Sequence, residues 1–218
     1  MFDMGFGAGF GADAGFADAA GDGLESMYQE VILDAARNPH GKTHFESTDE
    51  LAQAELQEES QESAENTKSA EITLNNAHES CVAAGENSAL GQSHQFNPTC
   101  GDEVTMRVEL SRSANNDETP IVSSIKWDGH GCSISQASLS MMVDLVEGKS
   151  VDEALRLDAL FHKLMESRGE GFENEEDEDA LEDAMVLQGV SRYPMRIKCA
   201  LLAWEGLKDS IAKAMKEL

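Results

Sequence analysis

The chain has 218 residues, enough for one sizeable hydrophobic core. Lys and Arg total 16 against 42 Asp and Glu, which gives a formal net charge of -26 at pH 7. This charge argues against nucleic-acid binding, which needs a basic surface, disfavours anionic membranes, and favours partners that carry a basic patch.

The first segment, residues 1–23, is rich in Gly, Ala, Phe and Asp, and we expect it to be a disordered tail. It lacks a basic region followed by an apolar stretch, so we expect no secretory signal. The sequence contains no run of 18 apolar residues, so we expect no transmembrane helix. Four cysteines without the spacing of a small disulfide domain then indicate a cytoplasmic protein whose thiols bind metal or act in catalysis.

Residues 24–40 are predicted to form the N-terminal helix of the core, which ends before Pro39 and carries one apolar stripe: Leu24, Met27, Tyr28, Val31 and Ile32. Residues 41–94 are rich in Glu, Gln, Ser and Asn. They predict an acidic disordered insertion.

The core is predicted to resume over 95–218. Residues 103–110 alternate between apolar and polar side chains and predict a half-buried strand; residues 121–129 predict a second strand with Ile121, Ile125 and Trp127 on one face. Helices are expected over 133–147, 151–167 and 180–187, and from Pro194 to the end of the chain, with an acidic loop over 168–180. This order predicts an α+β fold in which helices pack on one face of a small antiparallel three-stranded sheet.

Three cysteines of the core fall at element boundaries or on a helix. Cys100 and Asp102 are i and i+2 at a strand start, so their side chains point the same way. Cys132 precedes a helix start, where free N–H groups favour a thiolate, and Cys199 lies in the first turns of the last helix. Three thiolates and a carboxylate suit zinc, but this spacing equally allows inert buried thiols.

Four motifs carry a family resemblance: "LESMYQEVILDAARNP", "NPTCGD", "GHGCSISQASLSMM" and "LQGVSRYPMRIKCALLAWEGL". In order and spacing they resemble the SufU proteins, a branch of the IscU/NifU fold of iron–sulfur cluster assembly. The resemblance covers residues 24–39 and about 95–215. Two features favour the SufU branch: Lys198 stands where IscU scaffolds carry a histidine, and the added stretch at about 166–186 is similar to the SufU-specific insertion.

The resemblance implies a zinc ion bound by Cys100, Asp102, Cys132 and Cys199. It also implies that Cys100 accepts persulfide sulfur from a SufS-type cysteine desulfurase, which the protein also activates, and passes it to the SufBCD scaffold complex. On this hypothesis a donor group of the desulfurase, a histidine in the family, replaces Cys100 on the metal and frees the thiolate to attack.

Two other functions stay open. The same three cysteines and the carboxylate could hold a transient [2Fe–2S] cluster, which would make the protein an IscU/NifU-type assembly scaffold. A zinc-stabilised adaptor without sulfur chemistry is the third alternative.

The remaining candidate residues have simpler interpretations. Cys81, three residues after His78, is interpreted as a free thiol of the acidic insertion. His130 is interpreted as a turn residue that could lie near the metal, and Arg196 and Lys198 as a solvated helix flank that could contact a partner. The other histidines of the chain, His40, His44, His94 and His162, show no ligand spacing.

Overall fold

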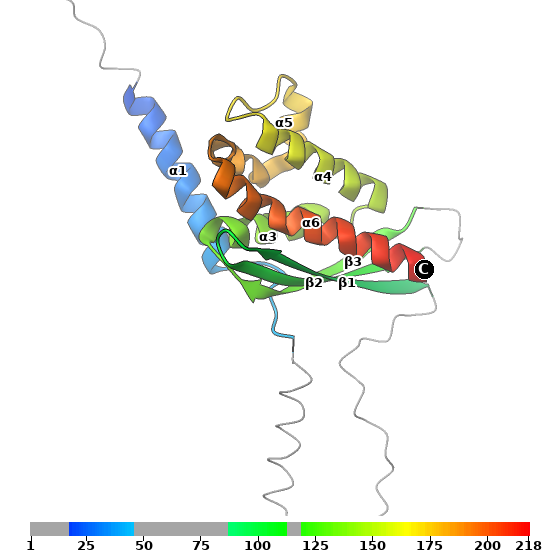
Figure 1. Cartoon of the computed structure of the whole chain (residues 1–218). Helices are drawn as coiled ribbons and strands as arrows, with labels where there is room; N and C mark the ends of the chain where they lie inside the picture. The colour runs from blue at the N-terminus through cyan, green and yellow to red at the C-terminus, as the bar shows by residue number, and fades with distance from the viewer. Residues whose placement is uncertain (1–17, 46–86, 113–118) are drawn as a thin grey trace, which may run out of the picture.

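The computed structural model describes residues 18–45, 87–112 and 119–218, so Cys81 and most of the expected acidic insertion lie outside the described residues (Figure 1). Helix α1 spans Asp18–Arg37, and strands β1, β2 and β3 span Ser88–Asn97, Asp102–Ser111 and Ile121–His130. The chain continues with α3 (Ser133–Val146), α4 (Val151–Glu166), α5 (Glu175–Leu181), the 3₁₀ helix η2 (Glu182–Arg192) and α6 (Pro194–Glu217). Within this described part, none of the helices is long and apolar enough to cross a membrane.

The three strands form one antiparallel sheet in the order β1-β2-β3, and the helices lie over one of its faces, as predicted (Figure 1). The alternation predicted for β2 is confirmed. Val104, Met106, Val108 and Leu110 are fully buried, whereas the residues between them are only half-buried. The buried side chains of β2 therefore form the floor of the core beneath the helices.

Strand β3 corrects one detail of the expected pattern. Ile121 was expected inside with Ile125 and Trp127, but it is 43% exposed, and Val122 is fully buried instead. The pairing of β3 with β2 shifts register between Glu109 and Leu110, which leaves Ser123 as an extra residue in β3. A bulge of one residue exchanges the inward and outward positions beyond it.

Helix α6 lies unusually close to β1 because small residues face each other there. A Cβ atom added to Gly91 would come within 1.9 Å of the carbonyl oxygen of Ser210. The hydroxyl of Ser93 donates to the carbonyl of Gly206 at 2.8 Å and accepts from the hydroxyl of Ser210 at 2.9 Å. These contacts set the distance of α6 from β1 and the rotation of α6 about its own axis. They therefore also set the position of Cys199, which lies near the start of α6.

The helical region after α4 differs from the expected helix over 180–187. Asn174 caps α5 by accepting from the backbone N–H of Glu176 at 3.1 Å, so a helix begins within the expected acidic loop. Glu182 has φ of 45°, which a right-handed α-helix does not allow, and the chain continues from there as η2. The stretch at about 166–186 thus contains a loop, α5 and the beginning of η2.

The ordered core extends beyond the boundaries expected from composition. β1 begins at Ser88, ahead of residue 95, and α1 begins at Asp18, ahead of residue 24. Residues 41–45 also contact the core, since Lys42 forms a parallel bridge with Trp127 and the backbone N–H of Trp127 donates to the carbonyl of Gly41 at 2.9 Å. On α1 the expected apolar stripe is largely uncovered, with Met27 63% exposed.

Candidate metal centre

The first ligand candidate, Cys100, lies in the turn between β1 and β2. The N–H of Gly101 donates to the carbonyl of Asn97 at 2.9 Å, and Gly101 has φ of +73°, a conformation that side chains disfavour. A Cβ atom added to Gly101 would meet nothing within 4 Å. The turn therefore presents Cys100 at an open and exposed position.

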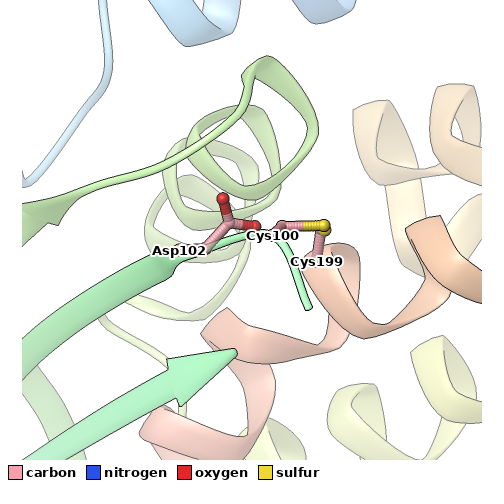
Figure 2. A group of neighbouring side chains, drawn as sticks. All are labelled: Cys100, Asp102 and Cys199. Carbon is pink, nitrogen blue, oxygen red and sulfur yellow. The ribbon is translucent and has the colours of Figure 1, made fainter. Parts of the chain in front are cut away.

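Helix α6 brings Cys199 to the same point. Its side chain is 1% exposed, its Sγ lies 3.2 Å from the Sγ of Cys100, and both cysteines are free thiols. Asn97 donates from Nδ2 to the Sγ of Cys199 at 3.4 Å, and its Oδ1 accepts from the backbone N–H of Thr99 at 3.1 Å. Figure 2 shows the side chains of Cys100, Asp102 and Cys199 converging from the hairpin and from α6.

Asp102, at the start of β2, connects this pair to Cys132. Its side chain is 1% exposed, and its Oδ1 accepts from the backbone N–H of Cys132 at 2.9 Å. Cys132 is the N-cap residue of α3, and its Sγ lies 3.7 Å from Oδ2 of Asp102. The carboxylate therefore satisfies a free N–H group at the helix start and also faces the thiol there.

The four predicted ligands do not converge equally. The ligand atoms of Cys100, Asp102 and Cys199 all lie within 4.8 Å of one another, and this is the group of possible metal ligands found among the described residues. Cys132 lies at its edge, next to Asp102. Sulfur ligands about 2.3 Å from a tetrahedral zinc ion are about 3.8 Å apart. Small movements of these side chains would therefore bring the ligand atoms to the separations that zinc requires.

The electrostatics of the group favour a cation. Burial raises the pKa of the Cys199 thiol, and contacts with Asp102 and Cys100 and the negative charges of Cys132 and Asp102 raise it further. The thiol therefore resists losing its proton unless positive charge is supplied nearby. A divalent ion supplies that charge, and thiolates with a carboxylate are a donor set that zinc accepts.

The other sequence candidates lie outside this group. His130 ends β3 and is exposed. Lys198 is also exposed, and the guanidinium of Arg196 lies 4.8 Å above the ring of Tyr193. All three residues are therefore at the surface, but His130 is the last residue of a strand and not the turn residue that was expected.

Three residues around the thiols were missed by the sequence analysis. Besides Asn97, the hydroxyl of Ser135 donates to the carbonyl of Cys132 at 2.9 Å and lies 3.8 Å from its Sγ. A Cβ atom added to Gly131 would come within 2.4 Å of that hydroxyl and 3.0 Å of Oδ1 of Asp102. Two local sequence signals could have indicated them: Asn97 lies two residues before Thr99 in the turn, and Ser135 lies three residues after Cys132, the N-cap position of α3.

Comparison with known proteins agrees with this geometry. The family described as NifU-like N terminal domain matches residues 72–200. The zinc-dependent sulfurtransferase SufU of Bacillus subtilis is 40% identical over 117 residues, which are 54% of this chain and 71% of SufU. The iron-sulfur cluster assembly scaffold protein IscU of Streptococcus pyogenes is 41% identical over 118 residues, 54% of this chain and 67% of IscU.

Solved structures show the same architecture. A crystal structure of a hypothetical protein matches with a TM-score of 0.56 and 29% identity, covering 86% of this chain and 98% of that chain. The N-terminal part of a NifU-like protein from Brucella abortus, at 17% identity, shares the fold with a TM-score of 0.54 over 89% of this chain and 99% of its own. Sequence and fold together show that the chain belongs to the NifU-like N-terminal domain family of iron–sulfur cluster assembly, with SufU and IscU proteins among its relatives.

Proposed function

We propose that the protein is a zinc-dependent sulfurtransferase of iron–sulfur cluster assembly and that Cys100 is the sulfur acceptor. One observation carries the proposal: Cys100 is exposed at the hairpin turn although its sulfur touches the buried Cys199. Cys132 is exposed as well, but Cys100 is the exposed thiol of the close group with Asp102 and Cys199, and these two buried residues can stay in place while Cys100 meets a partner.

Two of the remaining ligands, Asp102 and Cys199, are suited to stay in place when Cys100 leaves the group. Asp102 and Cys199 are each 1% exposed, and both are held by further hydrogen bonds, from the N–H of Cys132 and from the amide of Asn97. Cys100, by contrast, precedes Gly101, beside which there is open space. A side chain of the partner can therefore approach Cys100 without displacing the core.

The chemistry is a thiol–disulfide type of exchange. The thiolate of Cys100 attacks the outer sulfur of a cysteine persulfide on the desulfurase, a new S–S bond forms at Cys100, and the desulfurase cysteine leaves as a thiolate. Electrons balance without an external oxidant, because one S–S bond forms as another breaks. Bound zinc keeps the sulfurs that it coordinates as thiolates and protects them from oxidation.

The partners follow from the family resemblance. We propose a SufS-type cysteine desulfurase as the donor, whose activity the protein stimulates, and the SufBCD complex as the acceptor. We also place the protein in the cytoplasm, because free thiols at a metal centre persist in a reducing compartment.

The scaffold function is the second candidate, because an IscU protein is as similar to the chain as SufU is. Three cysteines and a carboxylate can also hold a [2Fe–2S] cluster. Lys198 opposes this function. It stands where IscU scaffolds carry a histidine, and a protonated ammonium has no lone pair with which to bind iron.

The experiment that separates the two functions is a metal inventory after turnover. The protein is incubated anaerobically with its desulfurase, cysteine, a reductant and ferrous iron, and then separated from the partner. Sulfur transfer predicts a colourless protein with about one zinc per chain and almost no iron. A brown protein with about two irons per chain and no zinc would establish the scaffold function instead.

A second measurement assigns the acceptor. Mass spectrometry of the product should find the added sulfur on Cys100, and Cys100→Ser should abolish it. Cys81→Ser is the matched control, because Cys81 is the one cysteine of the chain outside the proposed site. Normal sulfur acceptance by Cys100→Ser would refute the assigned role.

A further inference from the structure

A groove of about 550 Å³ lies between α1, α3 and the start of η2. Met141 and Leu145 of α3, which are both buried, contribute to its lining. On the α1 side the groove is lined by Met27 and Val31, which are 63% and 41% exposed. Single apolar side chains at the surface are common, but here two large ones border an apolar hollow. The groove therefore offers apolar surface that the core leaves uncovered.

The groove exists because α1 is attached to the core near its C-terminal end. Just after the helix, the backbone N–H of His40 donates to the hydroxyl of Ser140 at 2.9 Å, and the imidazole of His40 contacts the carboxylate of Asp144. Ile32 and Ala36, in the last turns of the helix, pack against the core. Figure 1 shows the first turns of α1 projecting away from the other helices. α1 therefore diverges from α3 toward its own start, which leaves the groove open.

Acidic side chains surround the apolar lining. Five of the lining residues are acidic: Glu30, Asp34, Asp144, Glu182 and Asp183. Arg37 is the one Lys or Arg in the lining. Among the described residues, Asp144 alone of the five pairs with a basic group, the imidazole of His40. The other four carboxylates are exposed and form no salt bridge within the described part of the chain, so they are available to a cation from outside.

We propose that this groove is a docking site for a basic amphipathic helix of a partner protein. The apolar face of such a helix fills the hollow beside Met27 and Val31, and Lys or Arg on its flanks meet the carboxylates of the rim. Helices that bind in grooves present apolar side chains at every third or fourth position. The lining residues of α1 lie within 27–38, about 18 Å of helix, so the bound helix makes contact over about three turns.

Charge favours a different protein over this chain itself as the occupant. The chain has a formal net charge of -26, so a second copy would bring charge of the same sign to the acidic rim. Residues 1–17 contain two Asp and no Lys or Arg, and residues 46–86 contain one Lys against eleven Asp and Glu. A basic partner is attracted to the rim where these segments are repelled.

The groove is separate from the candidate metal centre. Its lining includes none of the four candidate ligands, Cys100, Asp102, Cys132 and Cys199. Met141 follows Cys132, the N-cap residue of α3, by nine positions, which corresponds to about 14 Å along the helix. A helix in the groove therefore need not cover the ligands. Its binding can be tested apart from the sulfur chemistry of the thiols.

The test is binding of a synthetic helix to the full chain. The probe is a fluorescein-labelled peptide of about 14 residues with leucines at every third or fourth position and lysines between them. The matched peptide has the same composition but no helical stripe of leucines. Fluorescence anisotropy at about 0.15 M salt, where distant charges are screened, should show at least about 10-fold tighter binding of the striped peptide.

Charge reversal tests the acidic rim. The double variant Glu30→Lys/Asp34→Lys changes two exposed carboxylates on adjacent turns of α1 and should weaken binding of the striped peptide about 10-fold or more. Glu170→Lys/Glu173→Lys is the matched control, because it changes the net charge equally at exposed positions outside the groove. This control should bind within about 2-fold of the wild type.

Loss of apolar surface tests the hollow. Met27→Ser/Val31→Ser should also weaken binding about 10-fold, whereas Leu33→Ser should not, because Leu33 is 40% exposed on the same helix but lies outside the groove. Equal far-UV circular dichroism of the variants and the wild type checks that α1 still folds.

Three results would overturn the proposal. The first is no preference of the wild type for the striped peptide. The second is unchanged binding by the two groove variants, or an equal loss in their controls. The third is a wild-type dimer in analytical ultracentrifugation that Met27→Ser/Val31→Ser dissociates, which would assign the groove to a second copy of this chain.

Discussion

The sulfur atoms of Cys100 and Cys199 lie 3.2 Å apart although 99 positions separate the two residues in sequence. One is delivered by a hairpin turn and the other by a helix that rests on the first strand of that hairpin. The site therefore depends on how α6 packs on β1 as much as on its own residues.

Removing the charge of Asp102 should weaken metal binding while the fold survives. In Asp102→Asn the amide oxygen can still accept from the N–H of Cys132, but the second ligand atom becomes an amide nitrogen. We expect zinc affinity to fall at least about 10-fold in competition with a chromophoric chelator. Asp209→Asn, at an exposed position, should bind as the wild type does. Unchanged affinity in Asp102→Asn would show that this carboxylate is not a ligand.

The raised pKa of Cys199 predicts how the stability of the metal-free protein depends on pH. The folded state holds the proton on this thiol, whereas the unfolded chain releases it at about pH 8.5. Stability from this group is therefore full below that pH and is lost as the pH rises above it, at about 1.4 kcal/mol per pH unit. Urea unfolding from pH 7 to 10 should show a steeper loss for the wild type than for Cys199→Ser, and equal slopes would contradict the prediction.

The bulge in β3 predicts opposite sensitivities for two neighbouring residues. Val122 is fully buried and Ile121 is 43% exposed. Val122→Ala should cost about 2 kcal/mol of unfolding free energy, whereas Ile121→Ala should cost well under half of that. Urea denaturation of both variants measures the difference, and the reverse order would mean that β3 pairs without the bulge.

The close approach of α6 to β1 predicts that Gly91→Ala is severe. Its Cβ would come within 1.9 Å of the Ser210 carbonyl oxygen, so α6 must move, and we expect a loss of about 3 kcal/mol or more together with weaker zinc binding. Gly148→Ala is the control. Gly148 has φ of +84° but open space around it, so it should cost about 1–2 kcal/mol and leave zinc affinity unchanged. Wild-type zinc affinity in Gly91→Ala would contradict the coupling of site and helix.

Two of the three strands and most helices were predictable because their signals are local. The alternation in β2 and the cap at Ser150 each act within a few residues, and both are found in the structure. The predicted burial of Ile121 was wrong because the inward and outward positions of β3 depend on how β3 pairs with β2. Strand β1 was not located from the sequence, because a strand of small and polar residues, such as Gly91 and Ser93, gives no apolar pattern.

The candidate site was predictable as a set of residues but not as an arrangement. The resemblance named Cys100, Asp102, Cys132 and Cys199, but the degree to which each converges depends on the packing of α3 and α6 against the hairpin.

The described residues that flank 46–86 are both held at the sheet, and this limits how short a linker between them can be. The N–H of Phe45 donates to the carboxylate of Asp128, whose backbone pairs with Thr105, and Ser88 pairs with Ser111 further along the same strand β2. Six residues of β2 cover about 20 Å, so a linker of about ten residues could join the two anchors. A shortened variant could therefore keep the sheet and the thiol turn in place.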